Sequence, residues 1–389
     1  MDSHWIGQDM DVTRVFNPER DLLDDIPEPA NLVSEMSTEL AAKYENIITR
    51  DRVSWNQEYD LVRKLGTGGQ GIVFLARRMG AFDVSFQLAL KFFRPDGYQD
   101  LNIYRSEMAR LAAVAMDVSR IQQDHVIDIF NIVEYEGILV LVTEWVDGFD
   151  LRQLLAPGLL ASLQKRVEPD RWEYINDVII TNAGFQCRLM PGVVVSILRE
   201  CLAGLSALHR ENVIHADLKP ANVMIKQTGN CKIIDLGSSF SIDRKPQRPT
   251  WTLRYAPVEV LEGDSHTPLS DLASLGYVVL ELLTGTIPFV GVNDVNELIR
   301  CKHDMWKRIP ELLPKDVARN GTLVEMLSKM IAPDPADRFS SLEEADLSQI
   351  GASEIARQLV KVDMDTVVSN EMRVLLREVS EISSTPDSQ

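Results

Sequence analysis

The hydrophobic pattern changes along the chain, from strand-like runs in the first third to helical spacing afterwards. One helical stretch, Ile103–Met116, interrupts the strand-like region. Three apolar runs predict strands within residues 59–146: Gly71–Ala76, Phe86–Phe93 and Ile138–Thr143. We therefore expect a small β-rich lobe in this part of the chain.

Helical spacing dominates from about Asp150 onward. Val193–His209 and Asp271–Thr284 predict two long helices, and the second is almost entirely apolar, which is typical of a buried helix. Two short strand-like pieces, Val223–Ile225 and Lys232–Ile234, lie between them, separated by a turn that contains glycine. The fold class expected is α+β and bilobal, with a small β-rich N-lobe and a larger helical C-lobe.

The same pattern suggests where the domain begins and ends. Residues 1–55 are polar and acidic and predict an extension that ends in a short helix through Ser37–Tyr44. Residues 346–389 predict a tail with an amphipathic segment, Glu371–Val379. The domain between them covers residues 56–345. We expect its N-lobe at about 56–146 and its C-lobe at about 147–345, with an insert at about 156–190.

Composition and charge narrow the possible partners. The 389 residues include 40 basic and 58 acidic side chains, a formal net charge of -18, which disfavours nucleic acid or an anionic membrane as the main partner. The N-terminus has no signal-peptide pattern, and we find no run of about 18 apolar residues. The four cysteines are widely spaced, without a zinc or redox motif. We expect a cytoplasmic protein without a membrane span.

The first candidate for chemistry is a glycine-rich segment that continues into a strand-like run. Glycines let a loop approach phosphate groups closely and offer backbone N–H donors without side-chain obstruction. A dinucleotide-binding loop would need a helix directly afterwards, so a hairpin over a nucleotide is the better interpretation, with a plain turn as the alternative. The segment consists of Gly66, Thr67, Gly68, Gly69, Gln70 and Gly71.

The second candidate is Lys91, which lies inside an apolar strand-like run. A buried lysine is costly unless its charge is paired. Glu107, on the predicted helix Ile103–Met116, is an available partner, and the ion pair would orient Lys91 toward the phosphates of a nucleotide. The alternative is a lysine whose ammonium group reaches solvent.

The third candidate is the segment from His215 to Asn222, followed by Asp235-Leu236-Gly237. Phosphoryl transfer needs positioning and charge neutralisation more than covalent chemistry. Asp217 could orient a hydroxyl nucleophile, Lys219 could steady the transferring phosphoryl group, and Asn222 with Asp235 supplies oxygen ligands of the kind Mg²⁺ prefers.

These residues match the catalytic loop and the metal-binding motif of protein kinases. Over about residues 59–345 the chain resembles the eukaryotic-type (Hanks-type) protein kinases, and Lys219 in Asp-Leu-Lys-Pro resembles the serine/threonine branch. The resemblance implies ATP and Mg²⁺ as cofactors and protein Ser/Thr hydroxyls as substrates. It also implies that Asp217, Lys219, Lys91 and Glu107 are catalytic and that Asn222 and Asp235 bind the metal.

The resemblance assigns further positions. It implies that Glu259 and Arg338 form a buried ion pair and that Asp271 holds the backbone of the catalytic loop. Thr252 corresponds to the substrate-loop threonine that contacts the catalytic aspartate and lysine. The implied adenine and ribose contacts are Val73, Ala89, Met224, Glu144, Val146 and Asp150, with Thr143 as gatekeeper. The alternatives are ordinary core packing for Val73, Ala89 and Met224 and helix capping for Asp150.

One departure from the family pattern is informative. Ala216 replaces the arginine that in the family receives the phosphate of a phosphorylated activation segment. We therefore expect activity that depends little on phosphorylation between Asp235 and Glu259.

Other classes of function stay open at this stage. A nucleotide-binding pseudokinase scaffold usually lacks one of Lys91, Asp217, Asn222 or Asp235, and all four are present. A small-molecule phosphotransferase can share the same loop. A regulatory partner could bind the 156–190 insert or the terminal extensions, although a loop packed on the domain is the simpler interpretation of the insert.

Overall fold

The computed structural model describes residues 14–15, 35–54, 58–246, 249–360 and 365–384. The chain forms two compact units, which are described separately. The sheet unit comprises the described residues within 1–112, 130–145 and 246–253, and the helical unit those within 113–129, 146–245 and 254–389. The predicted α+β fold, with a β-rich N-lobe and a helical C-lobe, is confirmed.

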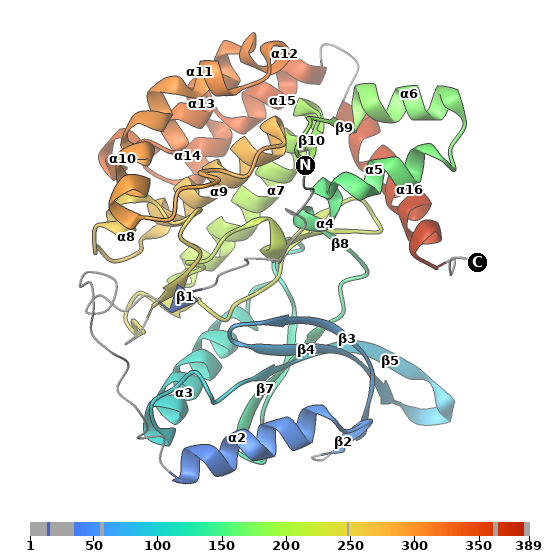
Figure 1. Ribbon diagram of the computed structural model, residues 1–389, viewed down its shortest axis with the longest axis vertical. Coiled ribbons are helices and arrows are strands. Elements are labelled where there is room, and N and C mark those ends of the chain that lie inside the picture. The colour runs from blue at the N-terminus through green and yellow to red at the C-terminus, as the bar shows by residue number, and fades with distance from the viewer. Residues whose placement is uncertain (1–13, 16–34, 55–57, 247–248, 361–364, 385–389) are drawn as a thin grey trace, which may run out of the picture. The chain divides into compact units, whose positions relative to one another are not determined.

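A six-stranded sheet in the order β2-β3-β4-β5-β7-β6 forms the sheet unit (Figure 1). The three predicted strands are present, but β2, β3 and β6 were missed. Most β3 side chains are exposed, and its apolar residues are mixed with charged ones without regular alternation. The strands are β2 Arg52–Ser54, β3 Glu58–Gly68, β4 Gly71–Met79, β5 Ser85–Phe93, β6 Ile129–Tyr135 and β7 Ile138–Glu144.

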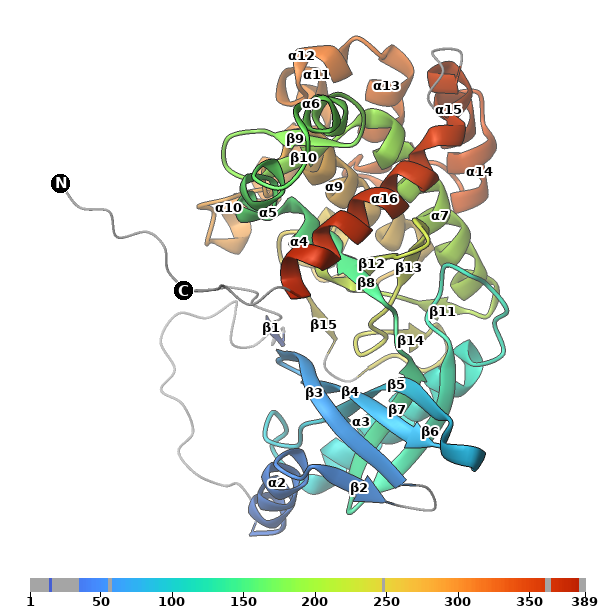
Figure 2. The ribbon, with the colours of Figure 1, turned by 90° about the vertical axis from the view of Figure 1, so that its right-hand side faces the viewer.

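Two helices accompany this sheet. The predicted short helix of the extension is real but longer than expected: α2 runs from Glu35 to Ile48 and buries Leu40, Tyr44 and Ile47, which lie on one face at helical spacing. The figures show α2 next to β2 (Figures 1 and 2). Residues 1–13 and 16–34 of the predicted extension lie outside the described residues.

The helix that begins in the sheet unit, α3 (Leu101–Val118), is tied to two strands through one phenol. Tyr104 is 1% exposed, and its hydroxyl donates to the Phe93 carbonyl at 3.0 Å and accepts from the Leu139 amide at 3.3 Å. A short 3-10 helix, η1 (Ala81–Asp83), connects β4 and β5. Strand β1 (Arg14–Val15) pairs antiparallel with β15 (Thr250–Trp251).

The helical unit is built around α7 and α9, both predicted from their apolar spacing. Helix α9 starts at Pro268, three residues before the predicted start at Asp271, because Thr267 caps it. It ends at Gly285, which lies in the left-handed region. The helices of this unit are α4 Leu151–Leu155, α5 Pro157–Gln164, α6 Pro169–Val178, α7 Pro191–Arg210, α8 Val258–Leu261, α9 Pro268–Thr284, α10 Val295–Met305, α11 Ile309–Leu312, α12 Lys315–Ala318, α13 Gly321–Met330, α14 Leu342–Leu347, α15 Ala352–Val360 and α16 Asp365–Ser384.

Short strands and 3-10 turns connect these helices, and a three-stranded sheet β13-β12-β8 carries the two predicted short strands. These elements are β8 Gly148–Asp150, β9 Ile180–Asn182, β10 Cys187–Leu189, β11 Val213–Ile214, β12 Val223–Lys226, β13 Cys231–Ile233, β14 Phe240–Ser241, η2 Pro220–Asn222, η3 Trp306–Arg308 and η4 Pro335–Asp337. By length and composition α7 could cross a membrane, contrary to our reading of the sequence, yet 67% of its apolar window is buried inside the fold.

The 156–190 insert is not a simple loop. It folds into α5, α6 and the hairpin β9–β10, and α16 of the C-terminal tail packs against α5 and α7 (Figure 2). Arg171 on α6 forms ion pairs with Glu371 at 2.7 Å and Glu378 at 3.0 Å. The amphipathic tail segment predicted at Glu371–Val379 is thus part of a longer helix that covers the insert.

Candidate active site

The catalytic-loop candidates come together in the helical unit. Lys219 Nζ lies 3.1 Å from Asp217 Oδ2, and the two side chains are 7% and 6% exposed. Asn222 Nδ2 donates to the Asp217 carbonyl at 2.8 Å and lies 3.4 Å from Asp217 Oδ2. A carboxylate, a cation and an amide are therefore held within one buried cluster, in geometry suited to positioning a hydroxyl beside a phosphoryl group.

The loop backbone is fixed by Asp271 of α9, as predicted. Its Oδ2 accepts from the His215 amide and its Oδ1 from the Ala216 amide, both at 2.9 Å, and His209 of α7 lies 2.8 Å from Oδ2. Burial alone would raise the pKa of Asp271, but the His209 hydrogen bond and the nearby histidines and amides outweigh it, so the pKa lies below its usual value. The carboxylate therefore stays ionised. His209 was not predicted from the sequence.

The two predicted metal ligands follow each other across the β12–β13 hairpin. The Ile234 amide donates to the Asn222 carbonyl at 2.9 Å, and Asp235 Oδ1 accepts from the Gly237 amide at 2.9 Å. Because Asn222 uses its amide nitrogen on Asp217, its side-chain oxygen is the atom offered to a cation. An amide oxygen and a carboxylate fit the oxygen preference of Mg²⁺.

The glycine-rich segment is the hairpin between β3 and β4, as predicted. A Cβ on Gly71 would lie 1.9 Å from the Phe92 carbonyl oxygen, so this glycine is needed for the close approach of β5. Gly66 and Gly68 have nothing within 4 Å of a Cβ. Gly71 is thus explained by the fold, and Gly66 and Gly68 leave open space where a ligand could approach.

Lys91 lies on β5 opposite Val73 of β4. Its ammonium group donates to Gln70 Oε1 at 3.1 Å and lies 4.9 Å from the centre of the Phe93 ring. Gln70 in turn donates to Thr250 Oγ1 at 3.2 Å. Lys91 is therefore connected to the glycine-rich hairpin.

The predicted partner of Lys91 is 7% exposed on α3. Glu107 Oε2 accepts from Arg110 Nε at 2.9 Å. The ion pair between Lys91 and Glu107 stays a prediction.

The remaining nucleotide candidates occupy strands or strand ends. Thr143 Oγ1 donates to the Glu144 carbonyl at 3.1 Å. Asp150 caps α4 by accepting from the Gln153 amide at 2.8 Å, so the capping role considered for it is confirmed. The other positions are Val73 on β4, Ala89 on β5, Met224 on β12 opposite Asp150, and Val146, which is 7% exposed.

Ala216 lies in an apolar cluster with Ile214 and Phe240. It is 5% exposed and has φ of +66°, in the left-handed region. His266 approaches the same place, with its ring 6.3 Å from that of Phe240. Burial lowers the pKa of His266, which keeps this ring neutral at pH 7. The position at which the family carries an arginine is thus apolar here.

The hydroxyls of the activation segment are largely hidden. Ser239 is 0% exposed and donates to the His215 carbonyl at 3.2 Å. Thr250 is half-buried. The other candidate hydroxyls, Ser238, Ser241 and Thr252, are between 6% and 8% exposed.

The end of this segment is anchored by the predicted ion pair. Arg338 Nη1 and Nη2 each donate to one Glu259 oxygen at 2.7 Å, in a buried, bidentate arrangement. Arg338 also donates to the carbonyls of Ala332, Leu269 and Pro333. All guanidinium nitrogens are therefore used, as a buried charge requires.

The two-unit α+β fold and the buried acid–lysine–asparagine loop are typical of phosphoryl-transfer proteins. The protein kinase domain family matches residues 59–350, three quarters of the chain. The chain therefore belongs to the protein kinase family.

Three bacterial relatives are similar to most of the chain. It is 25% identical over 329 residues to serine/threonine-protein kinase PrkC of Bacillus subtilis, covering 84% of this chain and 43% of that protein. It is 26% identical over 290 residues to the probable serine/threonine-protein kinase PknB of Lactococcus lactis, covering 74% and 40%. It is 28% identical over 288 residues to serine/threonine-protein kinase PknD of Mycobacterium tuberculosis, covering 73% and 38%. The chain thus spans about two fifths of the length of these relatives.

Proposed function

We propose that this chain is a serine/threonine protein kinase that transfers the γ-phosphoryl group of ATP to protein Ser or Thr hydroxyls. The observation that carries the proposal is the buried pair of Asp217 and Lys219 at 3.1 Å, joined by Asn222. The names of the relatives support a protein substrate over a small molecule.

In this proposal the chain acts mainly by positioning. Asp217 accepts the hydrogen bond of the substrate hydroxyl and takes its proton as the oxygen forms its bond to the γ-phosphorus. The bond from the γ-phosphorus to the β–γ bridging oxygen breaks, and ADP leaves. Lys219 offsets the negative charge of the transferring group. Bound Mg²⁺, held by Asn222 and Asp235, would neutralise phosphate charge.

ATP would be held by residues of several strands. The glycine-rich segment of residues 66–71 offers backbone donors to the phosphates, and Lys91 a positive charge. Glu107 would orient Lys91. Adenine would contact Val73, Ala89 and Met224 and the backbone of Glu144 and Val146, and ribose would contact Asp150. The contact of Lys91 with Gln70 supports a role near the hairpin.

Gly71 and Gly68 of the hairpin should have different roles, the first in folding and the second in ATP binding. Gly71→Ala places a Cβ against the Phe92 carbonyl, so we expect the free energy of unfolding to fall by about 2 kcal/mol. Gly68→Ala has open space and should leave stability unchanged, while the KM for ATP rises about fivefold because the loop is less free to close. Denaturant unfolding and initial rates measure both. An unchanged KM for ATP in Gly68→Ala would contradict the phosphate-binding role.

Activation-segment phosphorylation should matter little. Ala216 has no cation to offer a phosphate and lies in an apolar cluster with Ile214 and Phe240, and Ser239 is fully buried. Phosphatase treatment, or alanine at Ser238, Ser239, Ser241 or Thr250 one at a time, should leave the initial rate within about threefold. A hundredfold loss on phosphatase treatment would contradict this.

The proposal is tested by offering several acceptors to the purified chain. With ATP and Mg²⁺, we expect phosphate incorporation into a generic basic protein and none into an aminoglycoside. Incorporation into the aminoglycoside alone would instead support a small-molecule phosphotransferase. Nucleotide binding without any incorporation would support a pseudokinase scaffold.

The setting of the kinase is also a proposal. We place it in the cytoplasm, supported by the buried face of α7 and by the four cysteines, all free thiols, as in a reducing compartment.

A regulatory partner would bind the 156–190 insert or the terminal extensions. Because α16 already covers part of the insert, the partner would meet insert and tail together.

A further inference from the structure

Helix α10 carries a lysine in its buried face. Lys302 is 0% exposed and follows Leu298, itself 3% exposed, by one helical turn. Three side chains on the same helix, Arg300, His303 and Asp304, are exposed. The amphipathic spacing would place an apolar residue at position 302, so a lysine here needs a physical reason.

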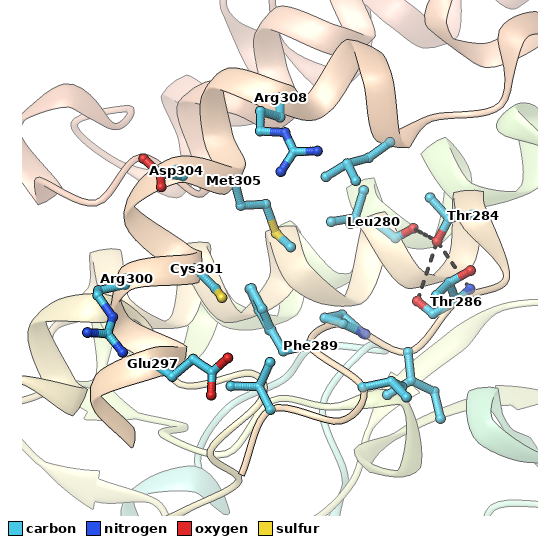
Figure 3. Close-up of a pocket in the computed structure, with 15 residues that line it drawn as sticks. Leu280, Thr284, Thr286, Phe289, Glu297, Arg300, Cys301, Asp304, Met305 and Arg308 are labelled. Carbon is cyan, nitrogen blue, oxygen red and sulfur yellow. Dashed lines mark hydrogen bonds between the residues drawn. The ribbon is translucent and has the colours of Figure 1, made fainter. Parts of the chain in front are cut away.

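Two aromatic rings surround the ammonium group. Lys302 Nζ lies 3.7 Å from the centre of the Tyr277 ring and 4.3 Å from that of Phe289, and these rings meet edge-to-face at 5.7 Å. Phe289 also lines a cavity of about 660 Å³ whose other walls include Cys301 and Met305 of α10 (Figure 3). The rings offer cation–π attraction, which is stronger in a site without water.

The charge of Lys302 is affected by Glu259, which raises its pKa, although burial has the larger effect. Among the residues that the structure describes, Lys302 has no carboxylate within ion-pair distance, and burial lowers its pKa well below the usual value. A buried lysine without a carboxylate is less favourable for stability than an apolar side chain of similar length. Stability therefore does not explain the choice of lysine.

The hydrogen-bond acceptor of Lys302 is a backbone oxygen in the activation segment. Its Nζ donates to the Arg254 carbonyl at 2.8 Å. Arg254 is two residues beyond Thr252, the substrate-loop threonine of the proposed function. Its neighbour Tyr255 is held separately, by a 2.6 Å hydrogen bond from its hydroxyl to the buried Glu281.

We propose that Lys302 is a positioning residue for protein substrates, which fixes the backbone at Arg254 so that the adjoining substrate loop has one conformation. Glu259 with Arg338 and Tyr255 with Glu281 anchor side chains of the segment. Lys302 holds its main chain at a point nearer to Thr252. This inference rests on the proposed kinase function.

The test replaces the donor and keeps the packing. Lys302→Met has an unbranched side chain of similar length and no N–H donor. We expect the KM for a protein substrate to rise about tenfold, as for loss of one buried hydrogen bond, with the KM for ATP within twofold of wild type. The midpoint of denaturant unfolding should stay the same or increase. Lys302→Gln, which keeps an N–H donor, should show a smaller rise in the KM for the protein substrate.

A matched control is Lys307→Met, because Lys307 lies on the neighbouring η3 turn and is exposed. It should leave both KM values unchanged. A wild-type protein KM in Lys302→Met would overturn the proposal. A lower free energy of unfolding together with an equal rise in the KM for protein and for ATP would also overturn it, because that result indicates a packing role. If Lys302→Met does not fold, Lys302→Leu, which also lacks an N–H donor, takes its place. An unchanged protein KM in that variant, or an equal loss toward both substrates, overturns the proposal. Failure of the kinase function itself would appear separately, as a wild type inactive toward proteins.

Discussion

Asp217→Asn is expected to lower kcat for protein phosphorylation by about a thousandfold. The amide keeps the shape of the carboxylate but cannot take the proton of the substrate hydroxyl. It also places a possible donor beside the Lys219 ammonium group, which lies 3.1 Å from Asp217 Oδ2. Autophosphorylation and phosphorylation of a generic basic protein, measured as initial rates, report the change.

The affinity for ATP gives the internal control for this variant. None of the proposed nucleotide contacts involves Asp217, so the Kd for ATP should stay within about threefold of wild type. Asp304→Asn, an exposed acid on α10, is the matched substitution and should leave both quantities unchanged. Equal phosphate incorporation by wild type and Asp217→Asn would remove Asp217 from its assigned role.

Arg338→Ala is expected to reduce the free energy of unfolding by about 3–5 kcal/mol. Removing this side chain leaves Glu259 buried and unpaired, and it also removes donors from the carbonyls of Ala332 and Leu269. Arg338→Lys should recover little, because one ammonium group cannot reproduce the bidentate geometry. Urea unfolding, followed by circular dichroism, measures the difference.

The matched control for this substitution is another arginine in an ion pair. Arg308 pairs with Glu311 at 3.1 Å, but their side chains are 61% and 68% exposed. Solvent screens such a pair, so Arg308→Ala should cost at most about 1 kcal/mol. Similar losses in the two variants would show that burial of the Glu259–Arg338 pair is not what makes it important.

Position 216, where the family carries an arginine, is packed by apolar side chains. Restoring the arginine by Ala216→Arg would place a long cation at a buried position that packs against Phe240. The side chains around position 216 are packed against a small residue, so an arginine there would require several of them to move.

Much of the fold and of the candidate chemistry could be predicted because the signals are local. Strands β4, β5 and β7 and helices α7 and α9 have strong apolar periodicity over many residues. Residues 215–222 of the catalytic loop are contiguous, so their order alone indicates the chemistry. Strand β3 was missed because its apolar and charged residues are mixed without a regular period. The insert was mistaken for a loop because its helices are short.

The sequence by itself determined the family, the α+β class and the identities of the catalytic and metal-binding candidates. Only the tertiary structure decided which groups support them: His209 beside Asp271, the apolar surroundings of Ala216, and Lys302 under the activation segment. Their partners are distant in sequence; 48 residues separate Lys302 from Arg254. Such contacts depend on how helices pack and on what is buried with them, and neither the spacing nor the type of a residue specifies this. Lys302 illustrates the reason: its position on α10 predicts an apolar side chain, and only the packed carbonyl and rings account for a lysine there.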